Sequence, residues 1–275
     1  MQIHGHDIGV CSWSLRPKSI TDLITAVKSL GLSHVQLALS SLLELDSKSR
    51  QSELHLLENA DLKLTSTMLS FPGEDYTTIH TIHQTGGYLP DDAWPQRKQL
   101  TIAASKLTAD LGVKLIGTHI GFVPAKGSAR YAVMLQRIGE ITTALAKDGV
   151  TLLLETGQEQ AAALVEFLDD LEAPNIGVNF DPANMILYGA GDPIEAIAVL
   201  AKFIQHVHVK DAIASRKPTE SWGDEVPFGT GQVGPARFLA ALHDAGYRGP
   251  LVIEREAGEN RAGDVKAAID NLQTI

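Results

Sequence analysis

The segment TLLLET, at residues 151–156, is an aliphatic run that ends in a carboxylate. The same pattern, apolar residues followed by a polar one, recurs at 178–181 (VNFD), 206–208 (HVH) and 251–254 (LVIE). Similar short runs, separated by helical stretches, continue toward the N-terminus. Eight runs are predicted as strands: Ile8–Trp13, His34–Leu39, Leu62–Leu69, Lys114–Gly121, Val150–Thr156, Ile176–Asp181, His206–Asp211 and Pro250–Glu256. Eight strands alternating with helices predict the α/β class and a closed (β/α)8 TIM barrel.

The length of the chain, 275 residues, fits one such barrel, which typically takes about 250 residues. We therefore expect a single domain over residues 1–275. Two connections, at 71–94 and 212–234, are long and contain several glycines and prolines. We expect both to lie over the barrel mouth, the first as a lid or wall. Pro193 and Pro235 lie where two of the helices should begin.

The composition argues for a small-molecule partner. Lys and Arg total 23 against 33 Asp and Glu, a formal net charge of −10 that repels nucleic acid. Cys11 is the only cysteine, so no intramolecular disulfide can form, and the N-terminus lacks the features of a signal peptide. No apolar run approaches the roughly 18 residues of a membrane span. We expect a cytoplasmic protein without a membrane partner.

Four consecutive predicted strands end in residues able to bind a metal. These residues are Glu155, Asp181, His208 and Glu254. Because the C-terminal ends of barrel strands converge on the active site, the four side chains should meet. Clustered carboxylates repel one another, and a divalent cation keeps them ionised. An oxygen-rich set with one imidazole favours Mn²⁺, Mg²⁺ or Co²⁺, and Zn²⁺ is also compatible.

Such a metal would suit enolisation of a substrate. A cation that chelates a carbonyl and the neighbouring hydroxyl acidifies the C–H between them and stabilises an enediolate. Glu155 and Glu254 are the candidate acid/base pair for the proton transfer. Taken singly, each strand-end carboxylate is more simply explained as a loop or cap residue, and it is their coincidence that favours a metal site. His206 shares a face with His208, and Glu256 shares one with Glu254, but both lie less favourably along their strands.

Further polar and aromatic residues near the strand ends are candidates for substrate binding. For His119, hydrogen bonds within the barrel are an equally good interpretation, and for Asn184 the alternative is a turn residue without a role in binding. Surface salt bridges are the simpler interpretation of Lys210, Asp211 and Arg216. The predicted substrate-binding set is His119, Asn184, Lys210, Arg216, Trp13 and Trp222, the two tryptophans by stacking on a sugar.

Several of these segments resemble the xylose isomerase-like TIM-barrel superfamily of sugar phosphate isomerases and epimerases. They are LLLETGQE, VNFDPANMILYGAGDP, HVHVKDA, WGDEVPFGTGQVG and PLVIERE. The resemblance covers nearly the whole chain. In the ketose 3-epimerase branch, the residues that match Glu155, Asp181, His208 and Glu254 bind one metal. Those that match Glu155 and Glu254 also form the acid/base pair, which implies the same roles here.

The sequence departs from two branches of this superfamily at residues that these branches use for metal or substrate binding. The endonuclease IV branch, with three zincs, has a histidine where this chain has Asn184 and an Asp-x-His pair where it has Gly223-Asp-Glu225. The ketose 3-epimerases have a substrate-binding glutamate where this chain has Ala161, and Glu159 is near but shifted. The first departure opposes DNA cleavage, and the second leaves the sugar undefined.

The sequence therefore predicts an isomerase or epimerase of a sugar, sugar phosphate or keto-polyol that abstracts a proton next to a carbonyl. Three alternatives remain: an inosose dehydratase-like lyase, an endonuclease IV-like abasic-site phosphodiesterase, and a non-catalytic sugar-binding barrel. Barrels of this sort often form homo-oligomers, but the sequence identifies no interface.

Overall fold

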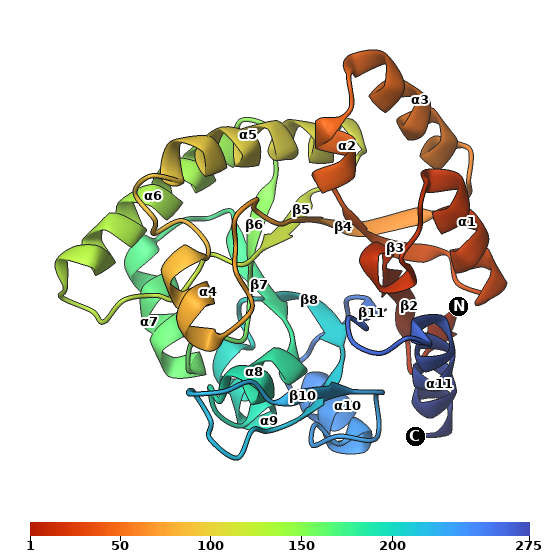
Figure 1. The fold of residues 1–275 in the computed structure, drawn as a ribbon. Coiled ribbons are helices and arrows are strands. Elements are labelled where there is room, and N and C mark those ends of the chain that lie inside the picture. The colour runs from red at the N-terminus through yellow and green to blue at the C-terminus, as the bar shows by residue number, and fades with distance from the viewer.

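The computed structural model describes all 275 residues, and its centre is a ring of parallel strands (Figure 1). The strands are β2 (His6–Cys11), β3 (His34–Ala38), β4 (Lys63–Leu69), β5 (Leu115–Thr118), β6 (Thr151–Glu155), β7 (Ile176–Phe180), β8 (Ile204–Val209) and β11 (Leu251–Ile253). Their order is β2-β11-β8-β7-β6-β5-β4-β3, and β3 pairs back onto β2 with Cys11 opposite Gln36. The sheet is therefore closed, and the predicted (β/α)8 barrel is confirmed.

A layer of helices surrounds the strands (Figure 1). It consists of α1 (Ile20–Ser29), α3 (Ser47–Glu58), α5 (Trp94–Asp110), α6 (Ala129–Ala146), α7 (Ala161–Leu171), α9 (Pro193–Leu200), α10 (Pro235–Asp244) and α11 (Arg261–Thr274). As predicted, Pro193 and Pro235 occupy the first turns of α9 and α10, where a missing N–H costs nothing. None of the helices is long and apolar enough to cross a membrane.

Most of the additional elements follow the C-terminal ends of barrel strands. They are η1 (Ser12–Leu15), α2 (Ser40–Glu44), α4 (Ile79–Thr85), α8 (Pro182–Tyr188) and the antiparallel pair β9 (Asp211–Ile213) and β10 (Asp224–Val226). The exception is β1 (Gln2–Ile3), which pairs with the start of β2. Because parallel strands all end on the same side of the barrel, these insertions build the walls of its mouth.

The two long connections meet at this mouth. Segment 71–94 contains α4, and segment 212–234 contains β10. The indole Nε1 of Trp222, in the second segment, donates a hydrogen bond of 3.2 Å to the backbone carbonyl of Tyr76 in the first. The contact joins the loops that follow β4 and β8.

Side chains alternate between the barrel interior and the layer beneath the helices. On β8, Val207 and Val209 join the aliphatic core under the helices. His206 and His208 face the interior, where they contact Ser66 and Gln36. The barrel interior near the mouth is therefore polar, and polar side chains from several strands can form a binding site there.

Candidate metal centre

Four neighbouring strands position the predicted ligands. Glu155 is the last residue of β6, and Asp181 directly follows β7, where its side chain also caps α8 by accepting from the backbone N–H of Asn184. His208 lies within β8. Glu254 directly follows β11, and its backbone N–H bonds to the carbonyl of Val209.

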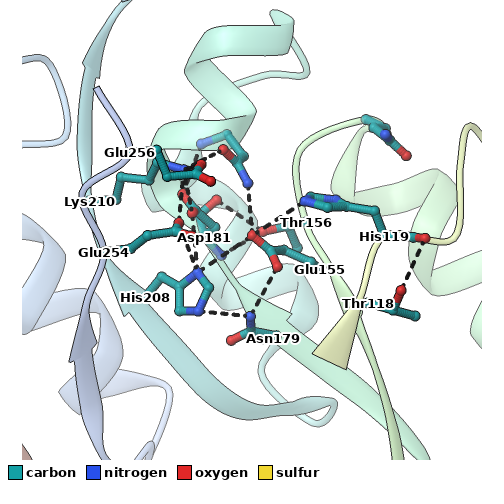
Figure 2. A network of polar contacts seen from close by, with 12 residues as sticks. Thr118, His119, Glu155, Thr156, Asn179, Asp181, His208, Lys210, Glu254 and Glu256 are labelled. Atoms are coloured by element: carbon teal, nitrogen blue, oxygen red, sulfur yellow. Dashed lines mark hydrogen bonds and ion pairs between the residues drawn. The ribbon is translucent and has the colours of Figure 1, made fainter. Parts of the chain in front are cut away.

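The structure brings these four side chains together (Figure 2). One ligand atom from each lies within 4.8 Å of the others, and all four residues are buried. His208 Nδ1 lies 3.2 Å from Glu254 Oε2, 3.3 Å from Asp181 Oδ2 and 3.5 Å from Glu155 Oε1. The imidazole therefore presents Nδ1, and not Nε2, to the three carboxylates.

The donor set fits a divalent cation. Three carboxylates and one imidazole match the preferences of Mn²⁺, Mg²⁺ and Co²⁺, and Zn²⁺ also accepts this set. Glu254 Oε2 is buried and accepts no hydrogen bond of normal geometry, although His208 Nδ1 and Lys210 Nζ lie near it. A buried anionic oxygen without a directed partner is suited to coordinate a cation.

The two glutamates have different partners. Glu155 Oε1 accepts a 3.0 Å hydrogen bond from Asn184 Nδ2 and lies 3.6 Å from His119 Nε2, while Oε2 lies 3.4 Å from Asn179 Nδ2. Glu254 Oε1 accepts a 2.7 Å bond from the indole of Trp13. Three of the predicted substrate-binding residues, Asn184, His119 and Trp13, thus contact the glutamates directly.

Lys210 lies inside the site, so the interpretation of it as a surface residue is wrong. Its ammonium is 2% exposed and lies 2.8 Å from both Glu254 Oε2 and Glu256 Oε2 (Figure 2). It also donates to Asn184 Oδ1 at 3.2 Å. Lys210 is the single residue between β8 and β9, and it is buried at the barrel mouth.

A cavity of about 430 Å³ opens beside the cluster. Tyr76, Tyr188 and Trp222 contribute aromatic surface, and Lys210 and Glu256 are among the residues that contribute polar groups. His119 and Asn184 also line it. Among the predicted substrate-binding residues, His119, Asn184, Lys210 and Trp222 therefore border this cavity, and Trp13 borders a separate groove next to α1 and α2.

The structure does not bring Arg216 to the cavity. This residue is exposed in the loop between β9 and β10, where the chain has already turned away from the barrel axis. Glu159, close to the position of a family glutamate, is also outside the cavity lining. It accepts a 2.9 Å hydrogen bond from the backbone of Val123, and burial raises the pKa of its carboxyl to about 7.

The comparisons with known proteins agree with the barrel and the order of its elements. Residues 24–275 match the family model described as xylose isomerase-like TIM barrel. The chain belongs to this family. Among curated proteins, none matches the sequence.

Solved structures of similar fold span nearly the whole chain. A xylose isomerase domain protein from Planctomyces limnophilus is 35% identical, with a TM-score of 0.86 and 91% of each chain covered. D-psicose 3-epimerase from Clostridium cellulolyticum H10, solved with D-tagatose, is 17% identical, with a TM-score of 0.72 and 98% of each chain covered. A xylose isomerase-like TIM barrel protein from Mycobacterium smegmatis, solved with magnesium, is 16% identical, with a TM-score of 0.71, covering 100% of this chain and 99% of that one. The last two likenesses concern the fold.

In this xylose isomerase-like barrel, the carboxyls of the cluster have pKa values below their ordinary values despite their burial. Burial alone would raise their pKa values, because it penalises the charged form. For Glu155, the His119 and His208 imidazoles outweigh burial and bring the pKa below its ordinary value. For Asp181 and Glu254, the Lys210 ammonium and the His208 imidazole have the same effect.

The two basic groups of the site, His208 and Lys210, have pKa values above their ordinary values. Burial would lower the pKa of the His208 imidazole, but Cys11 and the carboxylates of Glu254 and Glu155 raise it well above its ordinary value. Burial would also lower the pKa of Lys210, but the carboxylates of Glu254 and Glu256 outweigh burial and raise it well above its ordinary value. Because a histidine binds metals only through a deprotonated nitrogen, we expect cation binding to release a proton from His208.

Sequence reasoning missed the carboxylates that hold the loops around Lys210. Glu225 on β10 accepts hydrogen bonds from Arg255 Nη1 (2.7 Å) and from the backbone of Glu256 (2.9 Å), which fixes β10 against the end of β11. Asp211 is buried and accepts from the backbone of Gly229, Gly231 and Val233, which orders the second long loop. Asp211 is therefore not a surface salt-bridge residue either. Only its position after an apolar strand could have indicated this role.

Proposed function

We propose that this chain is a divalent-metal-dependent isomerase or epimerase of a sugar, sugar phosphate or other keto-polyol. The observation that carries the proposal is the placement of two buried glutamates, Glu155 and Glu254, in one metal-binding cluster beside a cavity. D-psicose 3-epimerase shares this fold and supports the assignment to sugar chemistry.

The chain's own residues can perform the proton transfer. When bound, the cation would polarise a substrate carbonyl and acidify the adjacent C–H. Of Glu155 and Glu254, one would remove the proton as a carboxylate and become a carboxylic acid, and a carboxylic acid of the pair would then deliver a proton to the resulting enediolate. Asn184 and Asn179 orient Glu155, and Trp13 and Lys210 orient Glu254, so both bases are fixed before substrate binds.

The cavity suits a polyhydroxylated ligand. Tyr76, Tyr188 and Trp222 offer ring faces for the C–H surfaces of a sugar. Lys210, Asn184 and Glu256 offer donors and acceptors for hydroxyl groups. The link between Trp222 and the Tyr76 carbonyl supports a role for segment 71–94 as a lid that excludes water during the reaction.

The cofactor that we propose is one Mn²⁺, Mg²⁺ or Co²⁺ per chain, with Zn²⁺ as a fourth candidate. The ligands would be Glu155, Asp181, His208 and Glu254. The structure solved with magnesium shares this fold and supports the choice of a hard cation.

Incorporation of deuterium from solvent tests the function. The chain is incubated in D₂O with a panel of ketoses and keto-inositols, with Mn²⁺ or Co²⁺ added, and products are followed by NMR. We expect exchange at the carbon next to the carbonyl and formation of an isomer without loss of water. Exchange should disappear with EDTA and in Glu155→Gln.

Other outcomes would identify the alternatives. Loss of water would indicate a lyase. Thermal stabilisation by a sugar without any exchange would indicate a binding protein. Cleavage of abasic DNA with close to three zincs per chain would indicate a phosphodiesterase. Each of these results would overturn the proposed isomerase.

A further inference from the structure

The second nitrogen of His208 lies in a small buried cluster below the metal ligands. His208 Nε2 is 2.6 Å from Gln36 Oε1 on β3 and 3.1 Å from Asn179 Nδ2 on β7. Cys11 on β2 is the third neighbour, with its sulfur 3.6 Å away. All of these residues are buried, so the nitrogen has no contact with solvent.

The two amides present opposite groups to this nitrogen. Asn179 Oδ1 faces His206 Nδ1 at 2.7 Å, and so its amino group points toward His208 and Glu155. Gln36 points its oxygen at His208, and the Cys11 thiol donates to that same oxygen at 3.4 Å. An acceptor and a donor thus compete for one imidazole nitrogen, and the acceptor makes the shorter contact.

The outcome of this competition decides which nitrogen of His208 carries the hydrogen. His208 gives up one proton when a cation binds. A hydrogen bond to Gln36 keeps the remaining hydrogen on Nε2, which leaves the Nδ1 lone pair free for the cation beside the three carboxylates. A hydrogen bond from Asn179 would require the hydrogen on Nδ1, which would block the atom that must bind a cation. In metal sites, the partner of the distal ring nitrogen fixes the tautomer of the ligating histidine in this way.

The arrangement of Gln36 is unfavourable for the fold alone. Its Nε2 is buried and has no hydrogen-bond partner, and an unpaired buried amide destabilises the folded state. A rotation of the amide would face its N–H groups toward His208 and the Cys11 thiol, which already donates. The orientation is therefore explained by the contact with His208 and not by satisfaction of the amide.

We infer that Gln36 is a positioning residue that holds His208 in the tautomer with hydrogen on Nε2 and thereby prepares the cluster for a cation. This inference rests on the metal centre of the proposed function. Without Gln36, Asn179 would be the remaining polar partner of Nε2 apart from the thiol. His208 would then donate from Nδ1 to Asp181 or Glu254 and remain satisfied in the tautomer that excludes metal.

Calorimetric titration with Mn²⁺ of the EDTA-treated and dialysed chain, together with thermal unfolding in EDTA, tests the inference. In Gln36→Leu, the dissociation constant for Mn²⁺ should rise about 10- to 100-fold, and the unfolding temperature in EDTA should stay the same or rise. Gln36→Glu keeps an acceptor and should recover most of the Mn²⁺ affinity. Thr67→Val is a matched control: Thr67 is buried on the next strand and bonds to Thr108 at 2.7 Å. It should unfold at a lower temperature with an unchanged dissociation constant.

Two results would overturn the inference. One is wild-type Mn²⁺ affinity in Gln36→Leu. The other is a loss of affinity that occurs only together with a lower unfolding temperature and is not recovered in Gln36→Glu, as expected for a purely structural residue. Failure of the wild-type chain to bind Mn²⁺ would instead overturn the metal centre itself, and this inference with it.

Discussion

The β6 side and the β11 side of the site contain equivalent glutamates in different surroundings. On the β6 side, Glu155 is contacted by the neutral amides of Asn184 and Asn179 and by the imidazole of His119. On the β11 side, Glu254 lies against the ammonium of Lys210. A lysine keeps its charge throughout the neutral range, whereas a neutral amide adds none. We therefore expect Glu155 to be the stronger base and Glu254 to be the carboxylate that is harder to protonate.

Replacement of the glutamates should give the largest effects. Both Glu155→Gln and Glu254→Gln should lower turnover by about 10²- to 10⁴-fold, because each removes a base. The difference between the two sides predicts that exchange of solvent deuterium into substrate survives better in Glu254→Gln than in Glu155→Gln. Near wild-type turnover in both variants would remove the assignment, and exchange surviving only in Glu155→Gln would reverse the comparison.

Removal of the ammonium tests the β11 side alone. Lys210→Met leaves Glu254 and Asp181 without the buried ammonium, so that only His208 compensates their charges, which should cost about 3–5 kcal/mol of unfolding free energy. Urea unfolding in EDTA measures this change. Lys202→Met breaks an exposed pair with Asp169 and should cost less than about 1 kcal/mol. Equal costs in the two variants would show that Lys210 does not compensate the cluster.

In EDTA, the unfolding free energy should fall on both sides of a maximum in pH, at low pH because of the carboxyls and at higher pH because of His208. The carboxyls of Glu155 and Glu254 have lowered pKa values in the folded chain, so their contribution is present above the ordinary value of 4.5 and lost as pH falls below it. His208 has a raised pKa, so its contribution is complete below 6.5 and lost as pH rises toward the folded value. Unfolding free energy should therefore be greatest between these limits.

Lys210→Met tests the acid limb of this profile, which is the fall in unfolding free energy at low pH. Without the ammonium, the pKa of Glu254 should rise, while Glu155, which does not contact Lys210, should keep its lowered value. The acid limb should still begin near pH 4.5, the value in the unfolded chain, but it should end at higher pH and show a smaller total loss of unfolding free energy than in the wild type. Urea unfolding at a series of pH values measures the shift, and an unchanged limb would contradict the difference between the two sides.

The smallest effect is expected at the rim of the cavity. Trp222→Phe keeps the ring but removes the N–H that bonds to the Tyr76 carbonyl, so KM for the sugar should rise about two- to tenfold. Arg216→Ala is the control, and it should leave kcat and KM unchanged because Arg216 is exposed away from the cavity. A larger effect at Arg216 than at Trp222 would mean that the loop between β9 and β10 reaches the substrate.

The barrel could be predicted from the sequence because the pattern of a short apolar strand followed by a helical stretch occurs eight times. All eight predicted strands exist, and the errors are confined to their ends: Lys114–Gly121 was predicted where β5 is Leu115–Thr118. After Thr118 the chain leaves the strand pairing, and His119 lines the cavity at the mouth. The meeting of Glu155, Asp181, His208 and Glu254 followed from the same pattern, because polar residues at the C-terminal ends of neighbouring parallel strands lie at the same end of the barrel.

The partners of the ligands could not be predicted in the same way. Lys210 is a charged residue after a strand, and only the three-dimensional arrangement shows that Glu254, Glu256 and Asp181 surround it. Gln36 and Asn179 did carry a signal, because each is a polar residue in the middle of an apolar strand. Contacts across the barrel interior join residues far apart in the chain, and a period of two along one strand does not indicate which of them meet.

The central claim is that Glu155, Asp181, His208 and Glu254 bind one cation. Anomalous diffraction at the manganese absorption edge, from crystals of the chain grown with Mn²⁺, tests it most directly. We predict a single strong anomalous peak per chain, surrounded by the three carboxylates and His208 Nδ1. No peak at this position, or a peak elsewhere with the three carboxylates paired only to His208 and Lys210, would contradict the account.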